Sequence, residues 1–398
     1  MNPLPSGRVM PIALRNEEGY LTAAEHLLYN GALKADRTGT GTRGKFGEIQ
    51  VEYDLINEDG DPTVCLPSTK EVFWDKAVVE LVWMLSGSNR LKFLIDHGVT
   101  FWNNWVIPGT EVWETLDWQQ RRDSMTKVQK AKWATWFDEF TGGQTEDGFP
   151  EFTQEQFDTI TAKLDEWGIG DTRLIDGDLG PVYGVQWRHW PDNRLIDPSV
   201  IYGSDAWEKY GSKGFVHLGT ADNGQLMIGR VIDQIKKLET ALDTRDQKAA
   251  RRVVLTAWNA AFIEEMALPP CHTLAQWCIE PDEAGEDRLH CKLYQRSGDW
   301  FLGVPYNVAF YSIFTHLLCA MCDLKAGRLY HTVGDAHIYT NHVDQIKQQL
   351  ATPINPESKP VIQLKRAEFG MSILEHKVED IVIKGYIPGA FIPAPVAV

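Results

Sequence analysis

The sequence predicts an α/β (α+β) protein in which helices pack on a mixed, twisted β-sheet. Helix-like and strand-like apolar patterns are interleaved along the chain, as in a layered fold. The composition, with 43% hydrophobic and 11% aromatic residues, is sufficient for a large core. The segments with these patterns are, for helices, 17–35, 68–88, 226–242 and 306–324 and, for strands, 48–55, 251–258, 274–280, 289–297 and 328–339.

The N-terminal part is predicted to contain a helix, a loop, a strand and a second helix. Residues 17–35 have apolar side chains at helical spacing, and a polar, glycine-rich loop follows at 34–47. Residues 48–55 alternate as a half-buried strand does. The amphipathic segment 68–88 ends in Ser-Gly-Ser, which is typical of a helix end.

Two segments differ in texture from the rest and are interpreted as insertions, because the strongest motifs lie on either side of them. Residues 106–177 are acid-rich and aromatic, with helical stretches at 126–140 and 153–168. Residues 191–223 are rich in loop-forming residues. The regular elements resume after the second segment and end in a long apolar helix and a strand.

Charge and composition exclude several classes of function. The 398 residues carry a formal net charge of −16, whereas a nucleic-acid partner usually requires a basic surface. No signal peptide or membrane span is recognised. The sequence therefore predicts a soluble, cytoplasmic protein without a membrane or nucleic-acid partner. A small anionic ligand stays possible, since a few clustered arginines can hold one inside an acidic protein.

The six cysteines are too few for a disulfide scaffold in a chain of this length. Cys319 and Cys322 form a CxxC pair, which permits a redox or zinc interpretation. They lie in an apolar helical run and the chain has no second CxxC, so two core cysteines one turn apart are favoured. No metal site is predicted.

Cys271 lies between loop-forming prolines and a predicted strand, in "ALPPCHT". A cysteine there is either a small apolar core residue or a nucleophile at the mouth of a strand. A nucleophilic thiolate needs nearby positive charge. The candidate arginines lie in loops or at strand ends and also suit an anion pocket: Arg37, Arg251, Arg252 and Arg296.

Seven blocks, in order, resemble the thymidylate synthase family: "DRTGTGT", "LGPVYGVQWR", "ARRVVLTAWN", "ALPPCHT", "LYQRSGDWFLGVPYN", "GDAHIYTNH" and "APVAV". The resemblance implies a single catalytic domain at 17–398, interrupted by the two insertions, and a homodimer that associates across the sheet. It also implies deoxyuridylate as substrate and 5,10-methylenetetrahydrofolate as cosubstrate, and it favours the nucleophile among the two interpretations of Cys271.

The resemblance implies a catalytic role for each of five residues. Cys271 would add to C6 of the pyrimidine and make C5 nucleophilic. Glu80 would order water and proton transfer near O4, and Tyr183 and His272 would support proton removal from C5. Asn307 would read the O4/N3 edge of the base, because a side-chain amide offers both a donor and an acceptor.

The remaining implied contacts divide by ligand. Those to the 5′-phosphate come from Arg37, Arg296 and Ser297 and, from the other subunit, Arg251 and Arg252. Those to the ribose 3′-hydroxyl come from His337 and Tyr339. Those to the folate come from Lys70, Trp102, Asp299, Gly303, Tyr306 and Val398.

The departures from the family pattern lie mostly on the folate side. Acidic Glu71 and Asp75 replace residues that are often basic and face the glutamate tail of folate. Phe101 and Asn103 change the wall beside the pterin, and Phe310 replaces a common serine. Neutral drift with local repacking is one explanation. The other is a looser wall that admits water to the exocyclic methylene, which would make the product 5-hydroxymethyl-deoxyuridylate. The intact "APVAV" favours methyl transfer and thymidylate.

Overall fold

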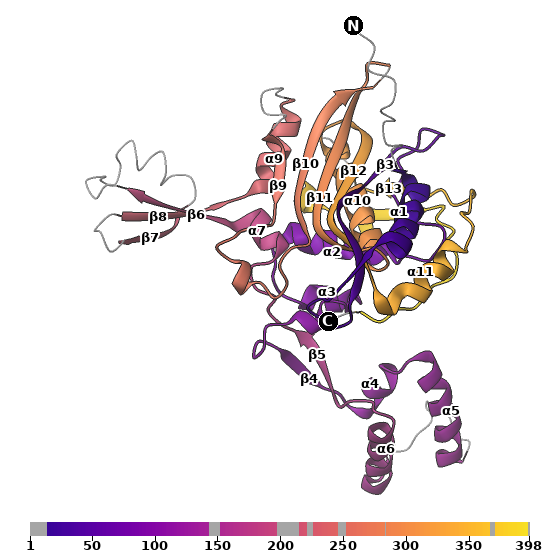
Figure 1. The fold of residues 1–398 in the computed structure, drawn as a ribbon. Helices are drawn as coiled ribbons and strands as arrows, with labels where there is room; N and C mark the ends of the chain where they lie inside the picture. The colour runs from indigo at the N-terminus through magenta and orange to yellow at the C-terminus, as the bar shows by residue number, and fades with distance from the viewer. Residues whose placement is uncertain are drawn as a thin grey trace.

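The computed structural model describes residues 14–142, 152–196, 215–220, 226–245, 252–282, 284–366 and 371–396. It is a mixed α/β structure with helices packed on a twisted central sheet, which confirms the predicted fold class (Figure 1). Two groups of elements extend away from this central body on different sides: α4–α6 with β4 and β5, and the strands β6–β8 (Figure 1). The sequence patterns that predicted a sheet with packed helices are therefore those of the central body.

The central sheet has seven strands in the order β1-β3-β12-β11-β10-β9, with β2 paired to β3. Neighbouring strands β11 and β12 are parallel, as are β1 and β3, whereas the other pairs are antiparallel. The strands are β1 (Leu14–Arg15), β2 (Ala32–Lys34), β3 (Thr42–Asp54), β9 (Val254–Thr256), β10 (His272–Pro281), β11 (Asp287–Asp299) and β12 (Lys325–Tyr339).

The helices of the central body are α1 (Asn16–Asn30), α2 (Trp74–Ser86), α3 (Lys92–Asp96), α7 (Tyr183–His189), α9 (Gln234–Asp243), α10 (Gly303–Met321) and α11 (Val343–Leu350). Short 3₁₀ turns lie at η1 (Asn103–Trp105), η4 (Ile263–Glu265), η5 (Thr340–His342), η6 (Ile373–Glu375) and η7 (Val378–Asp380). A small hairpin of β13 (Val361–Leu364) and β14 (Ile381–Lys384) completes this body.

The long helix α10 packs on β11, β12 and α2 and forms the centre of the core. By length and composition it is apolar enough to cross a membrane, but 83% of its most apolar window is buried inside the protein. Cys319 and Cys322 are buried at the end of this helix and are free thiols, as the core interpretation predicted. Tyr306 and Asn307 lie near the N-terminal end of this helix, which follows directly after the end of β11.

Two predicted helices are shorter than their patterns. The first ends at Asn30, because Ala32–Lys34 pairs with β3 instead. The second begins at Trp74, because the backbone before it bonds to distant side chains: Thr69 N donates to Glu17 Oε1 (2.8 Å) and Val72 N to the Tyr386 hydroxyl (3.0 Å). Hydrogen bonds to distant parts of the chain therefore override the local helical pattern at the end of the first helix and at the start of the second.

The predicted helix at 226–242 is wrong in its first half. Leu226–Ile232 forms β8, which pairs with β6 (Trp190–Ile196) and β7 (Phe215–Thr220), and α9 begins only after Asp233. The Asp233 side chain accepts a hydrogen bond from Lys236 N and so caps the helix. A short apolar run fits either state, and strand pairing decides here. The predicted loop segment 191–223 contains two of these strands, and its other residues lie outside the described part of the chain.

The acid-rich segment has a small core of its own. Its elements are β4 (Val112–Thr115), α4 (Trp118–Asp123), α5 (Lys127–Thr141), α6 (Gln154–Glu166) and β5 (Thr172–Asp176). All three helices begin with a capping box. The side chain of the N-cap residue accepts from the backbone N of a glutamine three residues on, and the side chain of that glutamine accepts from the N-cap backbone N. Aromatic side chains such as Trp133 and Phe137 pack between these helices, separately from the main core.

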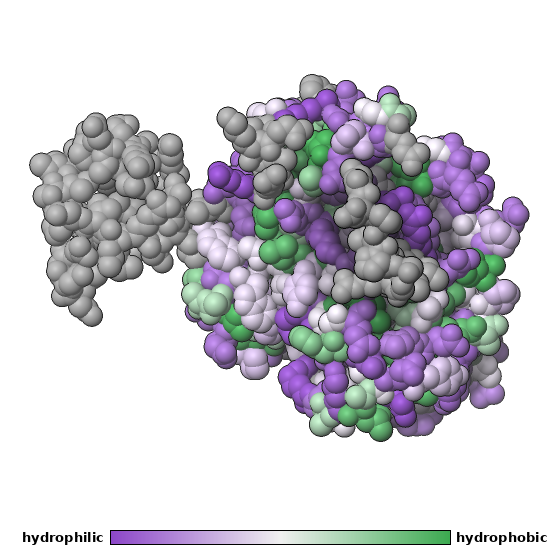
Figure 2. All heavy atoms as spheres, turned by 45° about the horizontal axis from the view of Figure 1, so that its top comes forward, coloured by the Kyte–Doolittle hydropathy of each residue, from purple (hydrophilic) through white to green (hydrophobic). Residues whose placement is uncertain are grey.

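The two faces of the central sheet differ in character. Buried apolar side chains alternate along β10 and β11 on the face toward α10, for example Trp277 and Leu293. Leu274 (37% exposed) and Tyr294 (40% exposed) belong to the opposite face. On the face of the molecule in Figure 2, hydrophilic side chains dominate and hydrophobic ones form small groups.

Candidate active site

Cys271 immediately precedes β10 and is held by bonds on both sides. Its amide N donates to the Tyr183 hydroxyl oxygen (2.8 Å), and its carbonyl accepts from Arg296 N on β11 (2.8 Å). The Arg296 guanidinium also donates to the carbonyls of Pro269 and Pro270 (2.8 Å each), and its Nη2 lies 3.9 Å from Cys271 Sγ. The prolines therefore orient the guanidinium beside the thiol.

The charges around the thiol act in opposite directions. Burial raises the pKa of Cys271, the positive charges of Arg296 and Arg37 lower it, and Asp299 raises it further. The net effect is a raised pKa, so ionisation of the thiol depends on the two arginines. Two of the arginines predicted from sequence thus act on Cys271 in this structure.

Arg37 lies in a loop that its neighbours make rigid. Asp36 accepts hydrogen bonds from Thr38 N (2.9 Å) and Gly41 N (2.6 Å), and Gly41 has φ 82°, which favours glycine. The exposed Arg37 guanidinium lies 5.0 Å from the centre of the Trp105 ring. Because a cation–π contact uses the face of the guanidinium, the N–H donors in its plane can bind an anion.

Glu80 is a buried carboxyl group on α2. Trp102 Nε1 donates to its Oε1 (2.8 Å), and burial raises the pKa of Glu80 to about 7 although this hydrogen bond lowers it. The Trp102 ring also meets the Tyr183 ring edge-on (6.1 Å between centroids). A carboxyl group with a pKa near neutrality can both give and accept protons, as general acid–base chemistry requires.

His272 is buried and neutral. Its ring stacks on Tyr183 (4.2 Å, 23° between planes), and its Nδ1 lies 2.9 Å from the Tyr311 hydroxyl. Burial lowers the pKa of His272 to about 3. The side chain therefore positions Tyr183 and takes no proton near neutral pH. Sequence reasoning missed Tyr311, which is linked to the site through this contact with His272.

Asn307, on α10, is fixed by a residue that the sequence analysis missed. Gln295 Nε2 donates to Asn307 Oδ1 (2.9 Å) and to the Ser297 carbonyl (2.9 Å). Gln295 Oε1 lies 2.8 Å from His331 Nε2 and accepts from it. Because Asn307 Oδ1 is engaged, its NH₂ group remains to donate to a base.

Asp299 ends β11 beside the start of α10. Its Oδ1 accepts from Phe301 N (3.0 Å) and Leu302 N (3.3 Å). Gly303 begins the helix, and a Cβ there would lie 3.6 Å from Asp299 Cβ and 3.8 Å from Asn307 Oδ1. The glycine thus leaves space between these two polar groups.

Lys70 is placed differently from an exposed ligand to the folate tail. Its buried ammonium donates to the Phe301 carbonyl and lies 3.6 Å from the centre of the Phe301 ring. Burial lowers the pKa of Lys70 to about 7. In this structure Lys70 supports the segment after Asp299, and its assignment to the folate stays a prediction.

Ser297, His337 and Tyr339 lie at the ends of strands β11 and β12. The parallel register pairs Ser297 with Asp335 and Asp299 with His337, which brings the two strand ends together. The His337 and Tyr339 rings meet edge-on (5.2 Å). Arg252 is exposed, whereas Arg251 and Val398 lie outside the described residues.

Three residues that depart from the family pattern, Phe101, Asn103 and Phe310, lie among the described residues. Phe101 is exposed, and its ring lies 6.2 Å from that of Tyr306. Asn103 Oδ1 is buried without a hydrogen bond among the described residues. Phe310 is buried and packs against His272 (5.6 Å), so it contributes to the wall behind Tyr183.

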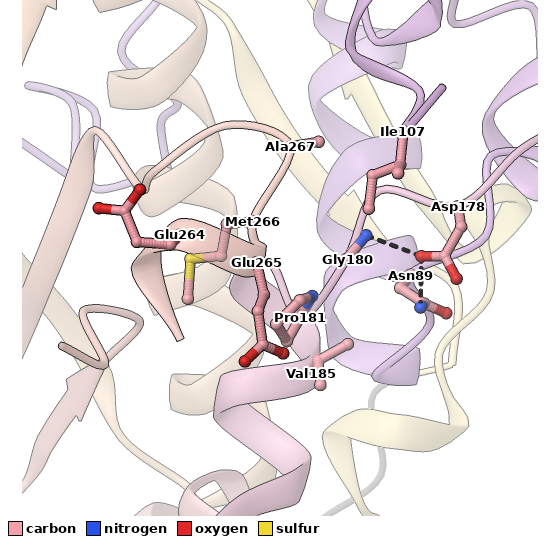
Figure 3. Close-up of a pocket in the computed structure, with 10 residues that line it drawn as sticks. All are labelled: Asn89, Ile107, Asp178, Gly180, Pro181, Val185, Glu264, Glu265, Met266 and Ala267. Carbon is pink, nitrogen blue, oxygen red and sulfur yellow. Dashed lines mark hydrogen bonds between the residues drawn. The ribbon is translucent and has the colours of Figure 1, made fainter. Parts of the chain in front are cut away.

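A separate pocket of about 560 Å³ lies beside the turn before α7 (Figure 3). Its lining includes Glu265 and Met266, and in it the Asp178 carboxylate accepts from Asn89 and from Gly180 N. The catalytic residues predicted from sequence are not part of its lining. Within the described residues, no group of three or more His, Cys, Asp or Glu could hold a metal ion.

Comparison with known proteins covers nearly the whole chain. A family model described as thymidylate synthase matches residues 18–398. A thymidylate synthase of Leuconostoc mesenteroides subsp. mesenteroides is 33% identical over 394 residues, which is 96% of this chain and 99% of the relative. The matched range includes every predicted site residue and both predicted insertions.

Proposed function

The chain belongs to the thymidylate synthase family of one-carbon transferases, and from this premise we propose that it methylates deoxyuridylate to thymidylate with 5,10-methylenetetrahydrofolate. The observation that carries the proposal is the setting of Cys271, between the Tyr183 hydroxyl and a guanidinium that two proline carbonyls orient. A buried structural cysteine has no need of such an arrangement.

The proposed chemistry begins with the thiol. The Cys271 thiolate adds to C6 of the uracil ring, because C5 is a poor nucleophile until something adds across the C5–C6 bond. C5 then attacks the folate methylene. Tyr183, whose hydroxyl already bonds Cys271 N, supports removal of the C5 proton, and Glu80 mediates proton transfer at O4. Loss of the C5 proton expels tetrahydrofolate by breaking the bond between the methylene and N5. Hydride transfer from this tetrahydrofolate to the exocyclic methylene, with elimination of Cys271 from C6, completes the methyl group and leaves dihydrofolate.

The base edge is assigned to Asn307. With its oxygen held by Gln295, the amide NH₂ of Asn307 can donate to O4 of uracil, whereas cytosine presents a donor at that position. Arg37, Arg296 and Ser297 are assigned to the phosphate, and His337 and Tyr339 to the ribose, as the resemblance implies.

A second product follows from the folate wall. The exposed Phe101 ring lies on the side from which water would enter, and Asn103 Oδ1, which is buried without a hydrogen bond among the described residues, can accept from a water that enters. Both features favour a deoxyuridylate hydroxymethylase. Methyl transfer is preferred, because Trp102, Asp299 and Tyr306 are present to hold the folate over the base.

We also propose a cytoplasmic homodimer formed across the outer face of the sheet. Leu274 and Tyr294 are exposed on that face. It also carries a hydrogen-bonded polar cluster, in which Lys292 Nζ and Thr332 Oγ1 donate to Gln50 Oε1 (2.6 and 3.0 Å). Arg251 and Arg252 are the residues proposed to cross to the partner's phosphate site. Residues 17–398 form one catalytic domain in this proposal, with 106–177 and 191–223 as insertions.

Covalent trapping tests the proposed activity. The protein is incubated with 5-fluoro-deoxyuridylate and methylenetetrahydrofolate, and the adduct is measured by mass spectrometry of the intact protein and of its peptides. The proposal predicts a stoichiometric adduct on the peptide that contains Cys271. Absence of the adduct, with the nucleotide still bound, would indicate a binding protein without this chemistry.

A further inference from the structure

The C-terminal segment 389–396, called the tail here, is docked along the folate side of the site. Gly389 N donates to the Ser68 carbonyl (2.7 Å), and the Phe391 ring packs on Phe73 (5.2 Å). Ile392 is buried, and Gln345 Nε2 donates to the Pro393 carbonyl at 3.4 Å. One more contact of the tail, at the Pro395 carbonyl, is made by a residue to which the proposed function gives no role.

That residue is His342, at the junction of η5 and α11. Its side chain is completely buried, and its ring packs against those of Phe301 and Tyr339 (5.6 Å each). Its Nε2 lies 2.7 Å from the Pro395 carbonyl oxygen. A carbonyl oxygen only accepts, so Nε2 must carry a hydrogen when the tail is docked.

The other ring nitrogen faces the proposed folate ligand. His342 Nδ1 lies 3.7 Å from Asp299 Oδ1 and has no hydrogen bond among the described residues. In the neutral ring, with the hydrogen on Nε2, the Nδ1 lone pair would face a carboxylate. In the imidazolium form, Nδ1–H is attracted to that carboxylate. Both docking and the carboxylate therefore favour the doubly protonated ring.

The charged surroundings agree with this arrangement. Burial lowers the pKa of His342, but Asp299 and the bond to Pro395 raise it, and the net shift is upward. Burial raises the pKa of Asp299, but His342 lowers it and the net shift is downward. Lys70 also lies near the pair and lowers the pKa of His342. Four further titratable groups interact with the Asp299 carboxylate: His337, Tyr339, Tyr20 and Cys271.

We propose that His342 is a positioning residue that couples docking of the tail to the orientation of Asp299 in the folate site. The inference rests on the proposed function, in which Asp299 accepts from the pterin. With Pro395 docked, the imidazolium is fixed between two acceptors and holds the carboxylate in place. When the tail leaves, His342 loses one acceptor and Asp299 loses a fixed partner.

The test compares two variants. His342→Gln keeps a donor that can reach Pro395 but removes the charge beside Asp299, whereas the control Gln345→Ala removes the weaker tail contact and leaves the pair intact. We expect His342→Gln to raise KM for methylenetetrahydrofolate at least tenfold and to change KM for deoxyuridylate less than twofold. Gln345→Ala should change either constant less than threefold.

The pH profile supplies a readout that a purely structural role would not move, and hydrogen exchange tests docking of the tail itself. In the parent, folate affinity should fall as pH rises through the pKa of His342, above its usual 6.5, because the imidazolium is the competent form. His342→Gln should lose this component while Lys70 still titrates. Backbone amides of the tail should exchange faster in a His342→Leu protein, without any substrate present.

The outcomes separate the inference from the proposed function. If the parent forms no covalent adduct, the proposed function fails, while tail exchange in His342→Leu still reports on docking of the tail by His342. If the parent turns over, equal effects of His342→Gln on both KM values, or a lower active fraction with unchanged KM, would overturn the inference. Unchanged tail exchange in His342→Leu would overturn it as well.

Discussion

Replacement of Gln295 with leucine should weaken recognition of the base, although Gln295 itself need not touch the substrate. Leucine has a similar volume but removes three bonds, to Asn307 Oδ1 (2.9 Å), to the Ser297 carbonyl (2.9 Å) and from His331 Nε2 (2.8 Å). Losing the bond that orients Asn307 costs about 1.4 kcal/mol in the transition state, or roughly a tenfold loss in kcat/KM. The preference for deoxyuridylate over deoxycytidylate should fall by a similar factor, because a freed amide can turn its oxygen to the base.

The same change should lower stability, since a buried group left unpaired costs about 1–3 kcal/mol. His331 is the most affected, because its Nδ1 already lacks a partner among the described residues. The assay is kcat/KM for both nucleotides together with urea unfolding. Gln349→Leu is the matched control, since Gln349 is equally buried but bonds Thr69 and Tyr20. A Gln295→Leu protein with less stability but full base preference would refute the reasoning.

Four further predictions concern the residues of the proposed site. Cys271→Ala should abolish turnover and leave deoxyuridylate binding measurable by calorimetry; activity within tenfold of the parent would remove the thiol from the mechanism. Glu80→Gln should lower kcat roughly 10²–10⁴-fold and remove an inflection near pH 7 from the rate profile. Because burial raises the pKa of Glu80 to about 7, the native state binds this proton more tightly than the unfolded chain does. The free energy of unfolding of the parent should therefore fall as pH rises from about 4.5 to 7. A Glu80→Gln protein whose free energy of unfolding, measured with urea, falls equally over this pH range would contradict this. Mixing inactive Cys271→Ala with inactive Arg252→Ala protein should restore activity after subunit exchange, and no recovery would place both residues of a site in one chain.

The sequence predicted the elements whose patterns coincide with their tertiary role. The strands β10, β11 and β12 and the helix α10 have apolar residues where the core needs them, so pattern and structure agree. Leu226–Ile232 was assigned to a helix because a short apolar run contains no information on its pairing partner, and β6 lies about 30 residues away in the chain.

In the candidate site, too, some residues could be predicted from the sequence and others could be found only from their tertiary contacts. Cys271 and Arg296 were identified because each lies in a recognisable block. Gln295, Tyr311 and His342 also lie in or beside such blocks, but their importance comes from contacts to Asn307, His272 and Asp299 that residue type alone does not reveal.

Lys70 illustrates a second kind of difference. A lysine beside the folate site is expected to be exposed, since its charge is costly to bury. In the structure its ammonium turns inward to the Phe301 carbonyl and ring. The direction of a long side chain is set by such local partners, which the sequence does not specify.

Product analysis in a single turnover tests the central claim most directly. The enzyme is mixed with deoxyuridylate and limiting methylenetetrahydrofolate, and the nucleotide mass is measured together with the absorbance of dihydrofolate. The account predicts thymidylate and one equivalent of dihydrofolate, because Trp102, Asp299 and Tyr306 are proposed to hold the folate over the base until hydride transfer. A product heavier than thymidylate by one oxygen, formed without dihydrofolate, would contradict methyl transfer. It would indicate that water enters at the Phe101–Asn103 wall and adds to the exocyclic methylene in place of hydride.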